Sequence, residues 1–228
     1  MKRKESSAHS IKPVIPCYYP AYIDLTGKKA VVVGGGSVAE RKILSLLKAH
    51  ADVKVISPYL TKRLEREKGK GGIRHVCRHY KKGDLRNAFL VIAATNSPRI
   101  NEQVSRDAPY LVNVVDVPDL CNFIVPSLVK RGPLTVAIST SGVSPAFSKS
   151  VRKELEKIYG PEFSDYLNAL KIIRKKAKET IRDKKKRSDF LKAIASEKMI
   201  EMIRKEGLSR TKRFVTEISR KAVKTARK

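Results

Sequence analysis

The sequence predicts an α/β fold in its first half, a small β segment after it, and a helical C-terminal part. Two observations lead to this prediction. From Tyr18 to about Leu120, short apolar runs typical of buried strands alternate with helical patterns, and after Ser144 only helical spacing remains. Strands that alternate with helices favour a doubly wound parallel sheet. We therefore expect a Rossmann-type parallel sheet, followed by a small β dimerisation segment and an all-α C-terminal domain.

The expected elements follow one another without long gaps. The first strand, residues 30–33, breaks at three glycines, after which apolar residues recur at helical spacing to about residue 49. Continuous or β-branched apolar runs mark the later strands, and residues 89–94 are typical of a strand buried on both faces. These strands are expected at 53–56, 73–80, 89–94 and 111–115, and the helices between them at 61–68 and 100–107.

The chain changes character after Pro118. Residues 123–129 and 134–139 resemble two strands joined by a Gly132-Pro133 turn. An isolated hairpin is marginal in water, so we expect it to pair in a homodimer, with an ordinary intramolecular sheet as the alternative. A helix follows from 145 to 160, and the chain then looks helical to its end. The expected divisions are a basic tail (1–17), a dinucleotide-binding domain (18–120), a β-hairpin segment (121–145) and a basic helical domain (146–228).

Composition restricts the function classes. The 228 residues are 41% hydrophobic, and no apolar run approaches a membrane span, so we expect no membrane association and no signal peptide. Cys17, Cys77 and Cys121 form no disulfide framework, which favours the reducing cytoplasm. Fifty Lys and Arg against 22 Asp and Glu leave a net charge of +28. This excess fits nucleic acid, an anionic substrate or a basic proteome. Because apolar residues interleave with the densest basic run, at 174–187, we interpret that run as a solvated helix face and do not expect nucleic acid.

A glycine turn joins the first strand to the first helix. It has a G-x-G-x-x-A pattern at Gly34, Gly36 and Ala39. In dinucleotide-binding proteins the first glycine permits the tight turn, the second lets the backbone approach a pyrophosphate, and a small third residue lets the helix pack closely. The phosphates then meet unpaired N–H groups at the helix N-terminus. We expect a dinucleotide site here, although a purely structural turn has the same pattern.

Polar residues end three of the strands at the sheet edge where ligands bind in this fold. Ser57, Pro58 and Tyr59 end the second strand, where an acidic residue usually binds the adenosine ribose and none is present. Thr95 and Asn96 end the strand at 89–94; they either place polar groups beside a cofactor or only turn the chain. Asp116 follows the last strand, and Pro118 favours an extended residue 117 that would direct the carboxylate into the cleft. That carboxylate can accept a proton, attract a cation or cap a turn.

Two other clusters of polar residues do not predict a functional site. His75, Cys77 and His79 alternate as metal ligands on one strand face would, but basic side chains crowd them and we expect no metal site. The hydroxyl groups between Ser139 and Ser144 have no patterned His, so we expect no hydrolase triad.

Six segments occur in the order found in one family: 34–42, 56–58, 93–95, 113–118, 123–127 and 139–145. Together they resemble precorrin-2 dehydrogenase, the dehydrogenase and ferrochelatase module of sirohaem synthesis. The resemblance runs from about Tyr18 to Glu156, and the basic C-terminal helices match only in general character.

The resemblance implies that NAD accepts a hydride as precorrin-2 is oxidised to sirohydrochlorin. The missing acid near Ser57 leaves NADP open, and ferrous iron is a substrate only if this chain is also a chelatase. Asp116 matches the family's functional aspartate, which assists deprotonation. The other matches are Ser37, Val38, Pro58 and Tyr59 at the cofactor and Asn113 and Thr140 near the tetrapyrrole. A basic cleft would concentrate such an anionic substrate.

A second interpretation belongs to another class of protein. A Rossmann domain that senses a ligand without catalysis, with basic helices that bind nucleic acid, fits the same composition. Salt-dependent DNA binding would distinguish it from an enzyme.

Overall fold

The structure is a computed structural model that describes residues 18–226, and it divides into two compact units, Met1–Val125 and Pro126–Lys228. The expected tail at 1–17, with Cys17, lies outside the described residues. The division follows Val125, whereas the sequence places the end of the first domain at Leu120. In the described residues, no helix is long and apolar enough to cross a membrane.

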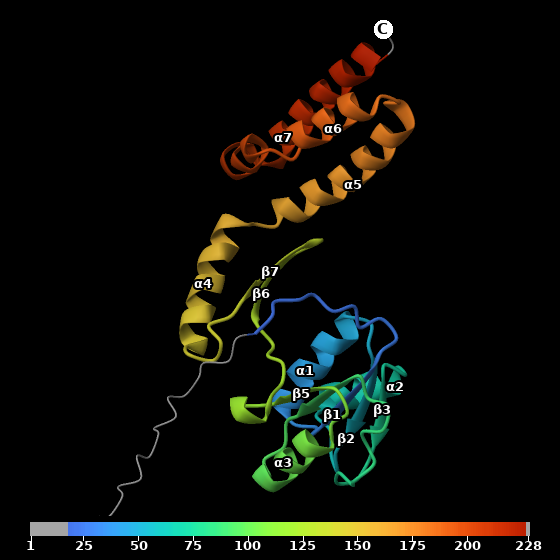
Figure 1. Cartoon of the computed structure of the whole chain (residues 1–228), viewed down its shortest axis with the longest axis vertical. Coiled ribbons are helices and arrows are strands. Elements are labelled where there is room, and N and C mark those ends of the chain that lie inside the picture. The colour runs from blue at the N-terminus through green and yellow to red at the C-terminus, as the bar shows by residue number, and fades with distance from the viewer. Residues whose placement is uncertain (1–17, 227–228) are drawn as a thin grey trace, which may run out of the picture. The chain divides into compact units, whose positions relative to one another are not determined.

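The first unit is a five-stranded parallel sheet in the order β3-β2-β1-β4-β5, which confirms the Rossmann-type prediction (Figure 1). Its strands are β1 (Lys29–Val33), β2 (Asp52–Ile56), β3 (Ile73–Val76), β4 (Leu90–Ala93) and β5 (Leu111–Val114). Its helices are α1 (Ser37–Lys48), α2 (Lys62–Gly69), α3 (Pro98–Asp107) and the short η1 (Pro118–Leu120). The strand order reverses beside β1, and in such sheets ligands bind at this switch point.

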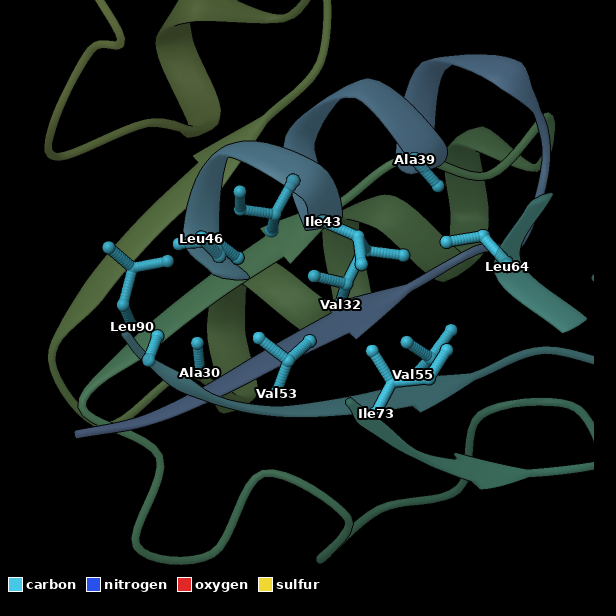
Figure 2. Packing of buried hydrophobic residues seen from close by; sticks show 12 residues of the cluster. Ala30, Val32, Ala39, Ile43, Leu46, Val53, Val55, Leu64, Ile73 and Leu90 are labelled. Carbon is cyan, nitrogen blue, oxygen red and sulfur yellow. The ribbon is translucent and has the colours of Figure 1, made fainter. Parts of the chain in front are cut away.

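The sheet is buried on both faces because its side chains alternate. Ala30 and Val32 of β1 pack on one face with α1 and α2, while Val31 and Val33 pack on the other with Val104 of α3. Figure 2 shows the first layer, in which the side chains of α1 lie over β1 and its neighbours. This two-sided burial holds the carboxyl ends of the strands in fixed register, with Val33 beside Ile56 and Ala93.

The second unit combines an antiparallel hairpin with helices. The hairpin is β6 (Ser127–Arg131) and β7 (Leu134–Ile138), and Gly132 turns it with a φ of 58°. The helices are α4 (Pro145–Ile158), α5 (Glu162–Thr180), α6 (Lys184–Ala193) and α7 (Glu197–Ala226). Arg131 fastens the hairpin to α4, because its Nε donates to the Tyr159 carbonyl at 2.7 Å. Gly207 interrupts α7 with a φ of 75°, so the helical C-terminal part is several packed helices.

Two strands differ from the sequence prediction. The third was expected to reach residue 80, but β3 ends at Val76, where the Arg78 amide turns back to the Val76 carbonyl at 2.9 Å. His79 therefore leaves the sheet. The sixth was expected from residue 123, but β6 begins at Ser127 because Pro126 has no N–H to donate to a ladder.

Candidate functional site

Packing explains the first two glycines of the turn between β1 and α1. Gly34 has a φ of 124°, and a Cβ there would collide with the Ala94 carbonyl. A Cβ on Gly35 would collide with the Tyr59 carbonyl and with Ser57. Both positions therefore need glycine so that the turn can fit between β2 and β4.

Gly36 is different, because a Cβ there would have no atom of the described chain within 4 Å. It is the N-cap of α1 and supplies no capping side chain. The first N–H groups of α1 therefore have no capping side chain from residue 36, and free N–H groups at a helix N-terminus are suited to an anion such as a phosphate. This open cradle fits a dinucleotide pyrophosphate.

The turn lines a cavity of about 560 Å³ at the carboxyl ends of the strands. Ten of the residues expected at the site line it together: Gly34, Gly36, Ser37, Val38, Ser57, Pro58, Tyr59, Thr95, Asn96 and Asp116. Asp116 is the only acidic residue in this lining. The lining therefore includes no carboxylate at the end of β2, where a ribose would be expected.

The end of β2 is braced by β3 and by the residues that follow it. His75 Nε2 donates to the Ser57 carbonyl at 2.9 Å, and the Cys77 thiol donates to the Pro58 carbonyl at 3.3 Å. These two groups therefore engage the loop, and no cluster of three or more His, Cys, Asp or Glu suited to a metal occurs in the described residues. Thr61 ties the same loop to the glycine turn, since its amide donates to the Gly35 carbonyl at 3.1 Å.

At the end of β4, Thr95 has a structural role. Its hydroxyl donates to the side-chain oxygen of Asn101 at 2.7 Å, and the side-chain NH2 group of Asn101 donates to the Thr95 carbonyl at 3.0 Å. These bonds fix the start of α3 against the strand. Asn96 is exposed at the cavity with its side chain available.

Asp116 occupies a strained turn after β5. The Val117 amide donates to the Val114 carbonyl at 3.3 Å, and Asp116 has a φ of 61°. A left-handed conformation is uncommon for a residue other than glycine and is often found at functional sites. The carboxylate is exposed, and its surroundings include Lys42 of α1. Burial lowers the pKa of Lys42, nearby Arg41 lowers it further, and Asp116 and Cys121 oppose the shift.

Two expected residues lie away from the cavity lining. Asn113 is buried in β5, where its amide donates to the Phe123 carbonyl at 3.1 Å. Thr140 belongs to the other compact unit. Its hydroxyl accepts from the Ser144 amide at 3.0 Å and stabilises the start of α4.

Several lining or neighbouring residues were missed from the sequence. Gly35 and Lys42 carry no distinctive spacing, because their roles depend on residues far along the chain. His79 and Tyr80 line the cavity only because β3 ends early. Tyr80 donates to Asp107 at 2.8 Å, and burial together with this bond raises its pKa.

Comparisons with known proteins agree with this geometry. A family model described as putative NAD(P)-binding matches residues 21–127, and one described as sirohaem biosynthesis protein central matches residues 131–158. The siroheme synthase of Methylobacillus flagellatus is 44% identical over 140 residues, which are 60% of this chain and 30% of the relative. That of Thioalkalivibrio sulfidiphilus is 38% identical over 176 residues, 76% of this chain and 36% of the relative. The chain therefore spans about a third of the length of these relatives.

A solved structure described as SirC, precorrin-2 dehydrogenase, matches with a TM-score of 0.76 and 26% identity. The match covers 89% of this chain and 100% of that one. A match over this share of the chain extends beyond the parallel sheet into the second compact unit.

Proposed function

We propose that this chain, which belongs to the precorrin-2 dehydrogenase and sirohaem synthase family, oxidises precorrin-2 to sirohydrochlorin with NAD as hydride acceptor. One observation carries the proposal: Asp116 lines the same cavity as the open Gly36 turn. A proton-accepting group and a pyrophosphate cradle thus share one space. When bound, the nicotinamide ring supplies the carbon that accepts the hydride.

The cofactor contacts in this proposal come from three strand ends. The backbone of Gly36, Ser37 and Val38 at the α1 N-terminus holds the pyrophosphate. Ser57, Pro58 and Tyr59 frame the adenosine end, and Asn96 lies beside the cofactor at the end of β4. No carboxylate of the lining lies at the end of β2 to repel a ribose phosphate, so the preference for NAD over NADP rests on the family.

Asp116 is the proposed base. Oxidation of the substrate removes one hydride and one proton, so a group at the cavity must accept the proton. Asp116 is exposed and can pass that proton to solvent. Lys42 adds positive charge beside it, which attracts the substrate carboxylates. We also propose Asn113 and Thr140 as substrate contacts, as the family resemblance implies.

We also propose that the chain forms a homodimer through the second unit. Leu128 of β6 is 45% exposed, and Val143 and Phe147 are 68% and 61% exposed. Burying these apolar side chains against a second copy would complete a two-stranded hairpin that is marginal alone. Light scattering after size exclusion tests this, because a monomer mass at micromolar concentration would contradict it.

The reducing cytoplasm is the proposed compartment, since the thiols of Cys77 and Cys121 are free.

The activity is tested with enzymatically made precorrin-2 and NAD, by following sirohydrochlorin absorption and NADH formation. We expect Asp116→Asn to lower kcat by about 100-fold or more, the usual contribution of a positioned base, while NAD binding measured by calorimetry is retained. Asp119→Asn is the matched control, because Asp119 is a nearby carboxylate outside the cavity lining. An oxidation rate equal to the uncatalysed background would contradict the proposal.

Two further assays test the other functions considered, iron insertion and DNA binding. Ferrous iron with sirohydrochlorin, without NAD, tests iron insertion by the same chain. Strong, salt-dependent DNA binding without oxidation would instead favour the nucleic-acid-binding sensor.

A further inference from the structure

The turn that carries Asp116 needs support from outside itself. It spans Val114 to Val117 and places Asp116 at its third position with a φ of 61°. That position favours Gly or Asn, and a conformation of this kind costs about 1 kcal/mol or more unless neighbouring contacts hold it. A hydrogen bond of 3.3 Å between the Val117 amide and the Val114 carbonyl closes the turn weakly.

The side chain of Cys121 contacts both ends of this turn. Its Sγ accepts from the Val114 amide at 3.1 Å and lies 3.2 Å from the Val114 carbonyl oxygen. The same Sγ lies 3.3 Å from the Val117 carbonyl oxygen. A thiol has one weak donor and a weakly accepting sulfur, so it can pair with an amide and a carbonyl at once. Cys121 thus joins the residues on either side of Asp116.

Other bonds keep residue 121 beside β5 independently of the thiol. The Asn122 side chain accepts from the Val112 amide at 2.7 Å and donates to the Tyr110 carbonyl at 2.6 Å. The Asn122 amide also donates to the Val112 carbonyl at 3.1 Å. A substitution of the thiol therefore removes the support of the turn and leaves the segment in place.

The charges around the thiol are compatible with a neutral donor. Burial raises the pKa of Cys121, and Asp119 raises it slightly, while the Val114 amide and Lys42 lower it. Lys42 of α1 interacts electrostatically with both the thiol and Asp116. A protonated thiol retains the S–H needed to pair with a carbonyl.

We infer that Cys121 is a positioning residue for Asp116: its thiol joins the two ends of the strained turn and so directs the carboxylate into the cavity. The role of the carboxylate rests on the proposed function, whereas the joining of the turn does not. A series of Cys121 variants tests the joining of the turn separately from the role of the carboxylate.

The first measurement is amide hydrogen exchange by NMR on the full chain. We expect Cys121→Val, which has similar size but cannot pair, to speed exchange at Val114 and Val117 by about tenfold or more. Cys121→Ser should restore slow exchange, since a hydroxyl donates and accepts. Ser105→Ala is the matched control, because the Ser105 hydroxyl donates to the Leu120 carbonyl at 2.8 Å, outside the turn from Val114 to Val117. Unchanged exchange in Cys121→Val would overturn the inference, whatever substrate the chain uses.

The second measurement is precorrin-2 oxidation. We expect Cys121→Val to lower kcat about tenfold with the KM for NAD unchanged, and Cys121→Ser to keep kcat within about threefold. In an Asp116→Asn background, Cys121→Val should lower kcat no further, because the two residues act as one unit. An equal loss in both backgrounds would overturn the positioning role. An inactive wild-type chain would contradict the proposed function alone, and the exchange result would still decide the joining of the turn.

Discussion

The cavity has two rims that are built differently. The β2 rim is residues 57–59, and the β5 rim is residues 115–117. Each has a backbone carbonyl in contact with a cysteine thiol: the Cys77 thiol donates to the Pro58 carbonyl, and Cys121 Sγ lies 3.3 Å from the Val117 carbonyl oxygen. Among the described residues of the β2 rim no φ is positive, whereas the β5 rim holds Asp116 at 61°. The first rim has the relaxed shape expected of a surface for a ligand, and the second uses strain to place one carboxylate.

This contrast shows where each rim is vulnerable. The β2 rim depends on close backbone packing against Gly35 and on the loop that follows β3. The β5 rim depends on a few contacts that oppose local strain. Substitutions at the first should therefore act through the fold or the cofactor, and substitutions at the second through catalysis.

The largest effect is expected from Gly35→Ala. The added Cβ would collide with the Tyr59 carbonyl and the Ser57 side chain, so the turn and the β2 rim must separate. We expect the free energy of unfolding to fall by about 3 kcal/mol, the upper end of the range for overpacked core positions, because the nearest contact is with backbone that cannot rotate away. Urea unfolding followed by circular dichroism measures it, and a loss below about 1 kcal/mol would show that the β2 rim adapts.

Gly36→Ala is the companion change one residue later. Its Cβ would meet nothing in the described chain, so we expect stability within about 0.5 kcal/mol of wild type. The methyl group would occupy the space that we propose for the pyrophosphate, so the Kd for NAD should rise about 10- to 100-fold, or about 1.4 to 2.8 kcal/mol. Calorimetric titration with NAD tests this, and unchanged affinity would place the pyrophosphate elsewhere.

The sequence predicts one rim better than the other for a physical reason. The parallel sheet, the glycine turn and the strand ends follow from local periodicity, and these strand ends meet because parallel strands share an edge. The residues that surround Asp116 cannot be predicted from local periodicity. Lys42 of α1 comes near Asp116 only through tertiary packing, and the Cys121 thiol contacts Val114 and Val117 on either side of it only because of how the loop after β5 folds, so no spacing marks either residue. The early end of β3 at Val76 was missed for the same reason, since a turn in the following residues overrides the alternating pattern.

Acid should weaken the loop beside the β2 rim. Arg78 holds Asp84 with two bonds of 2.7 Å, and these bonds lower the pKa of Asp84 below its ordinary value. A carboxyl group whose pKa is lower in the folded than in the unfolded state stabilises the fold fully at pH values above its unfolded pKa, which is about 4. This contribution is lost as the pH falls from about 4 through the pKa of the folded state. We expect Asp84→Asn to lower the free energy of unfolding by about 1 kcal/mol at pH 7 and to have little effect near pH 2.

The matched control for this acid effect is Asp52→Asn. Asp52 pairs with Arg74 at 2.6 Å, but both side chains are about half exposed, so the pair should contribute less than about 0.5 kcal/mol. Denaturant unfolding of both variants across pH measures the difference. Equal losses at pH 7 would mean that the burial of Asp84 contributes nothing.

The smallest effect is a gain in stability at the β5 rim. Asp116→Gly relieves the left-handed strain, and the relief should slightly exceed the added entropy of the unfolded chain, so we expect the free energy of unfolding to rise by about 0.5 kcal/mol. Asp119→Gly is the control, because Asp119 lies in η1 without a positive φ and a glycine there should destabilise by a similar amount. Thermal unfolding of both variants shows whether each substitution raises or lowers the stability of the fold. A stability gain combined with lost oxidation would mean that the chain keeps a strained residue for its chemistry, whereas a loss equal to that of Asp119→Gly would mean that the two rims do not differ in strain.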